Sequence, residues 1–212
     1  MIEQGTTEWF QQRCGKVTAS RVYDVMSSLK SGKPSAARTN YAAELVAEIM
    51  TGKPADSFDN AAMRWGRECE PLARSAYEAE TGQIVQLAGF VDHPSISNTG
   101  ASPDGYVNDN ALIELKCPNT ATHIETLLNN EIPVKYQYQM LWQLECTQRE
   151  WCDFVSFDPR LPPELQLFIK RFDRDDERLE NIRDEIVKFL DHVNNVVIKL
   201  ERIRSQQGNV NA

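Results

Sequence analysis

The sequence contains no hydrophobic run approaching the roughly 20 residues that cross a bilayer, which excludes a helical membrane protein. Its first residues, Met1-Ile2-Glu3-Gln4-Gly5, also lack the basic and apolar regions of a secretory signal peptide. We therefore expect a cytoplasmic protein with no membrane partner.

Cysteine and histidine are scarce and scattered. The five cysteines are odd in number and show no C-x-x-C spacing, which is typical of reduced thiols rather than of a disulfide framework or a zinc site. The same lack of local spacing argues against an iron–sulfur cluster. The three histidines, His93, His123 and His192, lie in unrelated contexts, so a Cys–His nucleophilic pair is not indicated.

Basic residues are in the minority, with 23 lysines and arginines against 31 acidic residues and a net charge of −8. This balance argues against a protein that coats nucleic acid. It does not exclude a nuclease, because acidic residues can gather at a metal site while a local basic lining contacts DNA. The candidates for such a lining are Arg13, Lys16, Arg21, Lys30, Lys33 and Arg38.

At 212 residues, of which 41% are hydrophobic, the chain fits one large domain. We assign residues 1–204 to a single domain and expect residues 205–212 to be disordered. Periodicity and capping residues predict helices over 18–29, 41–51, 60–82, from 119, over 133–147 and from 179. Strands are predicted over 84–91, 105–107, 111–117, 150–157 and 165–172. This order indicates an α/β fold with a mixed central sheet of about five strands, flanked by helices, and a long C-terminal helix.

The helix over residues 60–82 should kink near Glu70, because Pro71 interrupts its hydrogen-bond ladder. Its expected inward residues are Trp65, Cys69, Leu72, Ala76 and Tyr77. We therefore expect Trp65 to be a core residue.

The last helix carries apolar residues at steps of three and four from Leu179 to Ile203. This stripe fits either a helix packed on its own protein or a coiled-coil seam. We favour packing along the protein's own sheet.

Asp104 lies in a Pro-Asp-Gly turn, and Glu114 and Lys116 follow on the second of two strands joined by a tight turn. Side chains alternate along a strand, so Glu114 and Lys116 share a face, and Asp104 should lie beside them. Two carboxylates this close repel each other unless a cation lies between them, and hard oxygen ligands suit Mg²⁺ or Mn²⁺. Lys116 would orient or help to deprotonate a water and offset charge on a phosphate. The pattern predicts phosphodiester hydrolysis.

These residues also have an ordinary structural interpretation. Aspartate in Pro-Asp-Gly is common turn chemistry, and Glu-x-Lys on a strand is often a solvated cross-strand pair. The apolar neighbours Leu112, Ile113 and Leu115 instead place Glu114 on a central strand, where charged side chains are costly to bury without a partner. We therefore favour the functional interpretation.

Six short motifs occur along the chain in a fixed order. They are Glu3-Gln4-Gly5 with Trp9 and Arg13; Thr18-Ala19-Ser20; Trp65-Gly66-Arg67 with Glu70; Ser102-Pro103-Asp104-Gly105; Glu114-Leu115-Lys116-Cys117-Pro118; and Gln137-Tyr138-Gln139 with Trp142. On these motifs the chain, from Glu3 to about Phe172, resembles the phage lambda exonuclease group, also called YqaJ-type viral recombinases, of the PD-(D/E)xK nuclease superfamily. The resemblance implies a restriction-endonuclease-like core.

The resemblance also implies roles for individual residues. Those implied at a metal centre are Asp104, Glu114, the Leu115 carbonyl and Glu70, with Lys116 positioning the water. Spacing alone does not distinguish Glu70 from Glu68. Those implied in a pocket for a 5′-phosphate are Arg13, Ser20, Ser102 and Gln139. Arginine binds phosphate oxygens in a bidentate manner, and Ser20 lies near a predicted helix N-terminus, where backbone N–H groups favour anions.

The activity implied by the resemblance is Mg²⁺-dependent 5′-to-3′ digestion of one strand at double-stranded DNA ends, with Mn²⁺ as a substitute ion. The products would be mononucleotides and a 3′ overhang for recombination. A ring-shaped homotrimer, a single-strand annealing partner and a phage or prophage origin in the bacterial cytoplasm are also implied. Two alternatives stay open: an endonuclease of the same superfamily, which would cut a closed circle, and a non-catalytic module that binds DNA ends.

Overall fold

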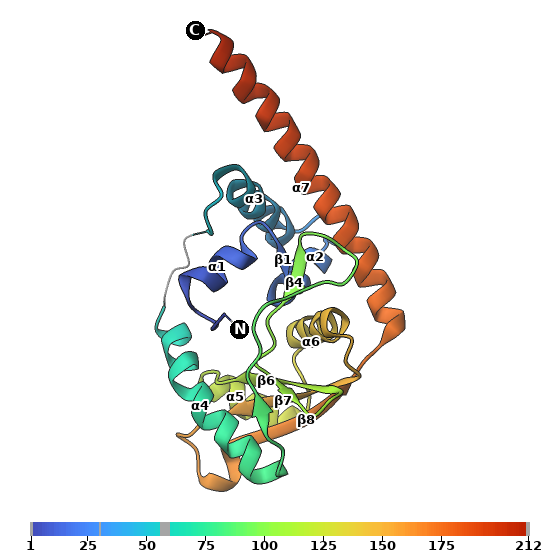
Figure 1. The fold of residues 1–212 in the computed structure, drawn as a ribbon. Helices are drawn as coiled ribbons and strands as arrows, with labels where there is room; N and C mark the ends of the chain where they lie inside the picture. The colour runs from blue at the N-terminus through green and yellow to red at the C-terminus, as the bar shows by residue number, and fades with distance from the viewer. Residues whose placement is uncertain (1, 30, 56–59, 211–212) are drawn as a thin grey trace.

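The computed structural model describes residues 2–29, 31–55 and 60–210. A mixed five-stranded sheet lies at its centre (Figure 1). In spatial order its strands are β2 (Val85–Gln86), β5 (Gly105–Val107), β6 (Ala111–Lys116), β7 (Trp151–Phe157) and β8 (Leu167–Asp173). β6 and β7 pair in parallel, and the other neighbours pair antiparallel. β6 is therefore an interior strand with both faces buried.

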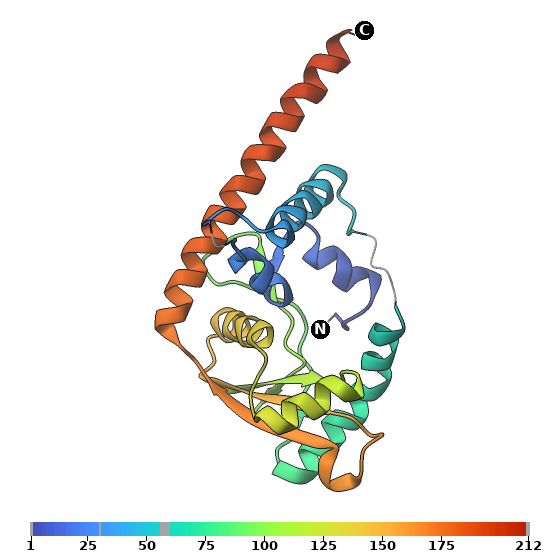
Figure 2. The same ribbon diagram turned by 180° about the vertical axis from the view of Figure 1, so that it is seen from behind.

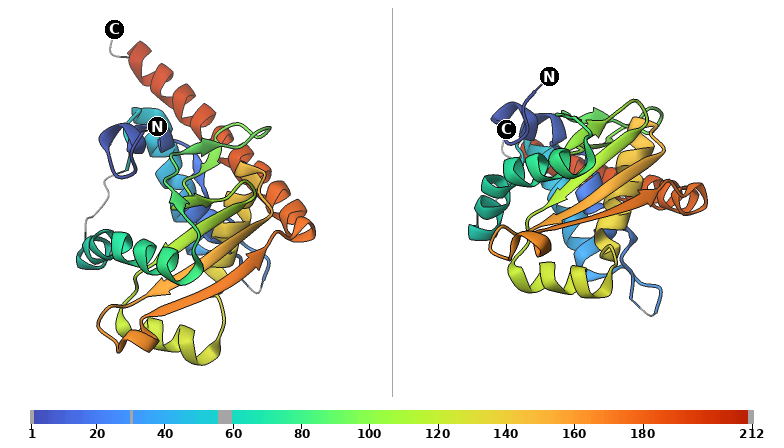
Figure 3. Two further views of the ribbon diagram at one scale, coloured as in Figure 1. Left: turned by 60° about the horizontal axis from the view of Figure 1, so that its bottom comes forward. Right: turned by 90° about the horizontal axis from the view of Figure 1, so that it is seen from below.

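Helices cover both faces of this sheet, as predicted (Figure 3). The helices are α4 (Ala61–Thr81) on one face, and α5 (Thr120–Asn129) and α6 (Val134–Thr147) on the other. Tyr77 of α4 packs in one apolar cluster with Ile113 of β6. Met140 of α6 packs in a second cluster with Leu112, the neighbouring residue of β6. The alternation of side chains along β6 thus divides the core into two layers.

A smaller three-stranded sheet lies beyond α6. Its strands are β1 (Val17–Thr18), β4 (Thr99–Ala101) and β3 (Val91–Asp92), in the order β1-β4-β3. Around it lie the helices α1 (Thr7–Arg13), α2 (Val22–Met26), α3 (Ala36–Thr51) and α7 (Asp176–Val210). Trp142 of α6 is fully buried, and its Nε1 donates to Oγ1 of Thr99 at 2.9 Å. The helix α6 therefore joins the two sheets.

The long helix α7 packs on other helices and not along the sheet, so that expectation was wrong. Its buried residues Leu179, Ile186 and Phe189 share a cluster with Tyr41 and Leu45 of α3. Further along, α7 extends past the rest of the molecule (Figure 2), and its exposed apolar residues there are Ile198, Leu200 and Ile203. Although α7 has 35 residues, neither it nor any other helix in the described ranges is apolar enough to cross a membrane.

The helix continues to Val210, whereas the sequence led us to expect disorder from residue 205. The sequence offers no helix-breaking residue between Ser205 and Gln207, and Gln has a good helix propensity. Residues 211–212 lie outside the described part of the chain.

Two other predicted elements differ from the structure. The helix predicted over 18–29 is an α-helix only over Val22–Met26. Before it, Thr18 belongs to β1 and pairs with Gly100 of β4, and Ala19–Arg21 form a 3-10 turn. The predicted strand over 84–91 is two short strands, β2 and β3, in different sheets. In both segments tertiary strand pairing decides the local conformation.

The helix α4 begins after Asn60, whose side chain accepts from Met63 N, and ends at Gly82, as predicted. Its buried stripe is Cys69, Ala73 and Tyr77, which recur every four residues. Leu72, expected inward, is 54% exposed. All five cysteines are free thiols, as expected.

A buried carboxylate on α6 forms an ion pair with an arginine of α7. Glu145, whose side chain is 6% exposed, accepts from Nη1 of Arg183 at 2.7 Å and from Nη2 of Arg174. The Nε2 of His93 lies 3.6 Å from the same carboxylate. Burial by itself raises the pKa of Glu145, but the hydrogen bonds from the two arginines outweigh it and lower that pKa.

Replacing Glu145 with Gln should lower the free energy of unfolding by about 2–3 kcal/mol at neutral pH, because a hydrogen bond to a charged group contributes about 1.5–3 kcal/mol. The depressed pKa means that this stability is present above the unfolded pKa of 4.5 and is lost as pH falls through the folded pKa. Urea denaturation should therefore show a smaller difference between wild type and Glu145→Gln as the pH falls below 4.5.

Glu185→Gln is the matched control. Glu185 also accepts from an arginine, Arg38, at 2.9 Å, but its side chain is 27% exposed. Its replacement should cost less than about 1 kcal/mol. An effect of Glu145→Gln that is independent of pH would contradict this account.

Candidate active site

The turn that carries Asp104 is fixed by close packing on both sides. A Cβ on Gly105 would lie 2.3 Å from Cγ1 of Val85 and 3.0 Å from the Gln86 carbonyl oxygen, so β2 can approach only a glycine here. From the N-terminal segment, Nε2 of Gln4 donates to the Pro103 carbonyl at 2.8 Å. This contact gives the Glu-Gln-Gly motif a structural role beside the turn.

Asp104 lies against β6. Its Oδ2 accepts from the backbone N–H of Leu115 at 2.7 Å. Burial raises the pKa of Asp104 well above its usual value, and repulsion by Glu114 and Glu70 raises it further, against the attraction of Lys116. The structure thus brings Asp104 within electrostatic reach of all three charged residues predicted at the metal centre.

Glu114 is fully buried, and two glutamines of α6 hold its carboxylate. Nε2 of Gln139 donates to Oε1, and Nε2 of Gln143 donates to Oε2, both at 2.6 Å. Gln143 was not predicted as a site residue. The signal that could have found it is its spacing, because residues four apart lie on the same face of a helix as Gln139.

Lys116 contacts the same carboxylate through its Nζ, which lies on Oε1 of Glu114. Burial lowers the pKa of Lys116, but the negative charges of Glu114 and Asp104 outweigh it and raise that pKa overall. In this arrangement Lys116 is a protonated hydrogen-bond donor. Its Nζ also lies 5.2 Å from the ring centre of Tyr136, which borders the same cleft.

A cleft of about 780 Å³ opens over these residues. Asp104, Leu115 and Lys116 line it from the sheet, and Glu70 lines it from α4. Glu68 is exposed outside the lining, so the structure distinguishes the two glutamates that spacing could not. Glu70 Oε1 accepts from Nη2 of Arg74 at 3.0 Å, and the side chain is 38% exposed.

The donor set in this cleft fits a hard divalent cation. The carboxylates of Asp104 and Glu114 and the carbonyl of Leu115 could supply oxygen ligands, which suit Mg²⁺ or Mn²⁺. Among the described residues, no three acidic, histidine or cysteine side chains are already grouped to hold a metal. Instead, Lys116 forms an ion pair with Glu114, and Arg74 forms one with Glu70. Burial raises the pKa of Asp104, and the nearby charges of Glu114 and Glu70 raise it further, so a cation bound here would stabilise its charged form.

A second polar site lies beside the cleft and is built on Arg13. The Nη1 of Arg13 lies 3.4 Å from Oγ of Ser102, which also accepts from Nε1 of Trp9 at 3.1 Å. The guanidinium stacks over the Trp9 ring at 3.9 Å. Burial lowers the pKa of Arg13 to about 10, and within the described ranges Arg13 forms no ion pair. A largely buried arginine without a carboxylate partner is suited to bind an anion.

The other two residues predicted in this pocket have other hydrogen-bond partners. Ser20 is exposed in the 3-10 turn, with its Oγ 3.4 Å from Oγ1 of Thr18. Gln139 is engaged by Glu114. The structure therefore joins Arg13 directly to Ser102 but shows no direct contact of Ser20 or Gln139 with that pair.

Most of the other basic residues predicted to line a DNA path are engaged inside the chain. Lys16 pairs with Asp92 at 2.7 Å, and Arg21 pairs with Asp24 at 2.7 Å. Arg38 lies in α3, which begins before the helix predicted over 41–51, and it pairs with Glu185 of α7. Lys30 lies outside the described residues.

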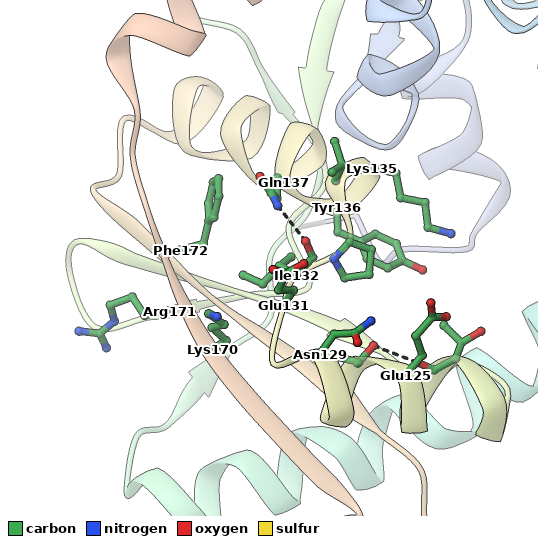
Figure 4. Close-up of a pocket in the computed structure, with 14 residues that line it drawn as sticks. Glu125, Asn129, Glu131, Ile132, Lys135, Tyr136, Gln137, Lys170, Arg171 and Phe172 are labelled. Atoms are coloured by element: carbon green, nitrogen blue, oxygen red, sulfur yellow. Dashed lines mark hydrogen bonds between the residues drawn. The ribbon is translucent and has the colours of Figure 1, made fainter.

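A second hollow, of about 560 Å³, adjoins the cleft at Thr122, Lys135 and Tyr136 (Figure 4). In this hollow Gln137 donates to the Ile132 carbonyl at 2.8 Å. The residues that line the hollow include both acidic and basic side chains. The hollow contains no aspartate, and nothing in it matches the carboxylate–lysine cluster around Glu114. The first cleft is therefore the candidate active site.

The wall of the cleft contains two residues whose position the sequence did not reveal. Trp65, expected in the core, is only half-buried and lines the cleft. Arg160 stacks over it, with the guanidinium carbon 4.3 Å from the ring centre. They are far apart in sequence, so no local pattern could have paired them.

Comparison with known proteins places the chain in a family. The model of the YqaJ-like viral recombinase domain matches residues 8–150, more than half of the chain. The alkaline exonuclease LHK-Exo from Laribacter hongkongensis is 48% identical, with a TM-score of 0.89 over 95% of this chain and 100% of that one. A structure of LHK-Exo in complex with dAMP matches equally well.

A phage-related exonuclease from Haemophilus somnus shares the fold, with 16% identity and a TM-score of 0.72 over 87% of this chain and 96% of that one. No curated protein gives a significant match. The matches confirm the α/β fold with its long C-terminal helix and support a nuclease role. The chain belongs to the YqaJ-like viral recombinase family, and it resembles the alkaline exonuclease LHK-Exo over 95% of its length.

Proposed function

We propose that this chain is a metal-dependent 5′-to-3′ exonuclease acting on double-stranded DNA ends, releasing 5′ mononucleotides and leaving a 3′ overhang for strand-annealing recombination. The observation that carries the proposal is the cluster of Asp104 and Lys116, which line one open cleft, with the buried Glu114 in contact with Lys116. Family membership and the identity to an alkaline exonuclease support it. The complex of that relative with dAMP is consistent with a nucleotide product.

In this proposal Asp104, Glu114 and the Leu115 carbonyl hold Mg²⁺, and Glu70 completes the site from α4. The bound ion supplies Lewis-acid charge and a water of lowered pKa. Gln139 and Gln143 fix the Glu114 carboxylate, and the protonated Nζ of Lys116 orients the water and donates to the phosphate as its charge develops. Mn²⁺, which accepts the same oxygen ligands, should substitute.

Arg13 and Ser102 are proposed to bind the terminal 5′-phosphate, with Ser20 and Gln139 at the border of that pocket. Ser102 lies two residues before Asp104, and Nε2 of Gln143 lies 3.4 Å from the Ser102 carbonyl oxygen. A bound terminal phosphate would thus be held at a fixed offset from the scissile bond. This would set the register for removal of one nucleotide at a time.

A ring-shaped homotrimer is proposed as the working form, in the cytoplasm of a bacterial host, with a single-strand annealing protein as partner. The support is electrostatic. The net charge is −8, and Lys16, Arg21 and Arg38 are paired inside the chain. Enclosure of DNA by a ring would replace the strongly basic surface that this chain lacks.

A linear duplex labelled separately at its 5′ and 3′ ends should lose the 5′ label as mononucleotide in Mg²⁺ and not in EDTA, while a closed circle stays intact. Cutting of the circle would favour the endonuclease alternative. Binding to ends with no cleavage in Mg²⁺ or Mn²⁺ would favour the non-catalytic module.

Glu70→Gln and Lys116→Met should each lower the rate of the labelled digestion by roughly 10²–10³-fold, as expected for loss of one group that stabilises transition-state charge. Glu68→Gln is the control, since it lies two residues away on α4 but outside the cleft. Equal effects of Glu68→Gln and Glu70→Gln would contradict the proposed site.

Arg13→Ala should remove any preference for 5′-phosphoryl over 5′-hydroxyl ends, because the buried guanidinium is the charged group of the pocket. Lys16→Ala, which removes a cation paired with Asp92, should keep the preference. The rates are compared on duplexes that differ only in the end group. Equal digestion of both ends by wild type and Arg13→Ala would show that no such pocket operates.

Sedimentation velocity over a range of protein concentrations should give a trimer whose mass is about three times 24.1 kDa. The closed ring buries an interface on every subunit, so the trimer should persist on dilution. A monomer at the concentrations used for digestion would refute the ring.

A further inference from the structure

Arg160 occupies a rigid position at the wall of the catalytic cleft. Its Nε and Nη2 donate to the two carboxylate oxygens of Asp158, at 2.7 and 2.9 Å. Asp158 is fully buried and also accepts from the backbone N–H of Arg160 at 3.0 Å. The guanidinium is therefore oriented before any ligand arrives, which lowers the entropy cost of binding.

Two further contacts tie Arg160 to the catalytic elements. Its Nη2 donates to the Pro118 carbonyl at 3.2 Å, two residues beyond Lys116. Its guanidinium stacks on Trp65, whose indole Nε1 is buried and has no hydrogen-bond partner in the described part of the chain. Stacking, rather than a hydrogen bond of the indole, thus holds the Trp65 ring beside Arg160.

One nitrogen of the Arg160 guanidinium remains available to a ligand. The side chain is 44% exposed, and its Nη1 makes no hydrogen bond within the described ranges. Lys135, from α6, also borders the cleft. Lys116 is already engaged by Glu114, whereas Arg160, which lines the cleft, supplies a cation whose position is fixed by Asp158.

We propose that Arg160, supported by Trp65 and Asp158, binds a backbone phosphate of the DNA strand in the catalytic cleft, separately from the terminal phosphate at Arg13. The inference rests on the proposed function, since it assigns a second phosphate contact to the same DNA-cleaving site. A fixed guanidinium matches the geometry of a phosphate, whereas a mobile lysine acts only as a point charge.

The chain contains a matched control for this arrangement. Arg171 also pairs with a buried aspartate, Asp153, at 3.3 Å and stacks on a tryptophan, Trp151, at 3.5 Å. It lies on β8 at the second hollow, where its guanidinium points away from Lys135 and Tyr136 (Figure 4). Arg160 and Arg171 thus have the same kinds of partner, a buried aspartate and a tryptophan ring, but only Arg160 lines the cleft.

The test measures DNA binding by fluorescence anisotropy in an Asp104→Asn background, so that the duplex is not cut. Affinity is measured between about 50 and 200 mM salt, because each phosphate contact contributes about 0.9 to the slope of log K against log salt. Arg160→Gln should make that slope shallower by about 0.9 and weaken binding roughly eightfold near 0.1 M salt. Arg171→Gln should leave the slope unchanged.

A double variant, Asp158→Asn with Arg160→Gln, separates binding from folding, because it does not leave a buried carboxylate unpaired. It should melt closer to the wild type than Arg160→Gln does and still show the shallower slope. Equal slopes for wild type and Arg160→Gln, or equal losses for Arg160→Gln and Arg171→Gln, would overturn the assignment. Failure of the exonuclease proposal itself has a separate readout, which is absence of 5′-label release by wild type.

Discussion

The burial of the Glu114 carboxylate inside the central sheet is the constraint on which the rest of the structure depends. A charged carboxylate with no exposed surface costs several kcal/mol unless hydrogen bonds and opposite charge compensate it. Gln139, Gln143 and Lys116 provide that compensation. Because both glutamines lie on α6, this helix is fixed against β6, and through Trp142 it also fixes the small sheet that carries the turn before Asp104.

The compensation of Glu114 leaves a second acidic residue, Asp104, close to other negative charges. Burial and the charges of Glu114 and Glu70 together raise the pKa of Asp104, against the attraction of Lys116. A buried charged cluster of this kind is often no more stable than apolar residues of similar volume, which agrees with the proposal that it binds a cation. Arg13 and Arg160 show the complementary arrangement, since each places a guanidinium with free donors beside the cleft.

The parts of the site that the sequence could predict are those set by neighbouring residues. A hairpin and the alternation of a strand bring Asp104, Glu114 and Lys116 together without knowledge of the fold. Gln143 follows Gln139 by one helical turn, but its contact with Glu114 depends on how α6 packs on β6. Arg160 reaches the site through packing of distant elements, and no local period marks it. Packing of distant elements also explains two wrong predictions. The start of the helix expected over 18–29 pairs with β4 as a strand, and α7 packs on helices and not on the sheet.

Titration of Mn²⁺ into the wild type and into Glu114→Gln, followed by calorimetry, tests the central claim most directly. The account predicts stoichiometric binding to the wild type and loss of that binding in Glu114→Gln, with both proteins folded by circular dichroism. The oxygen donors of Glu114 remain partly available in the amide, but its charge does not. Equal Mn²⁺ binding by the two proteins would contradict the claim that the buried carboxylate is the metal ligand.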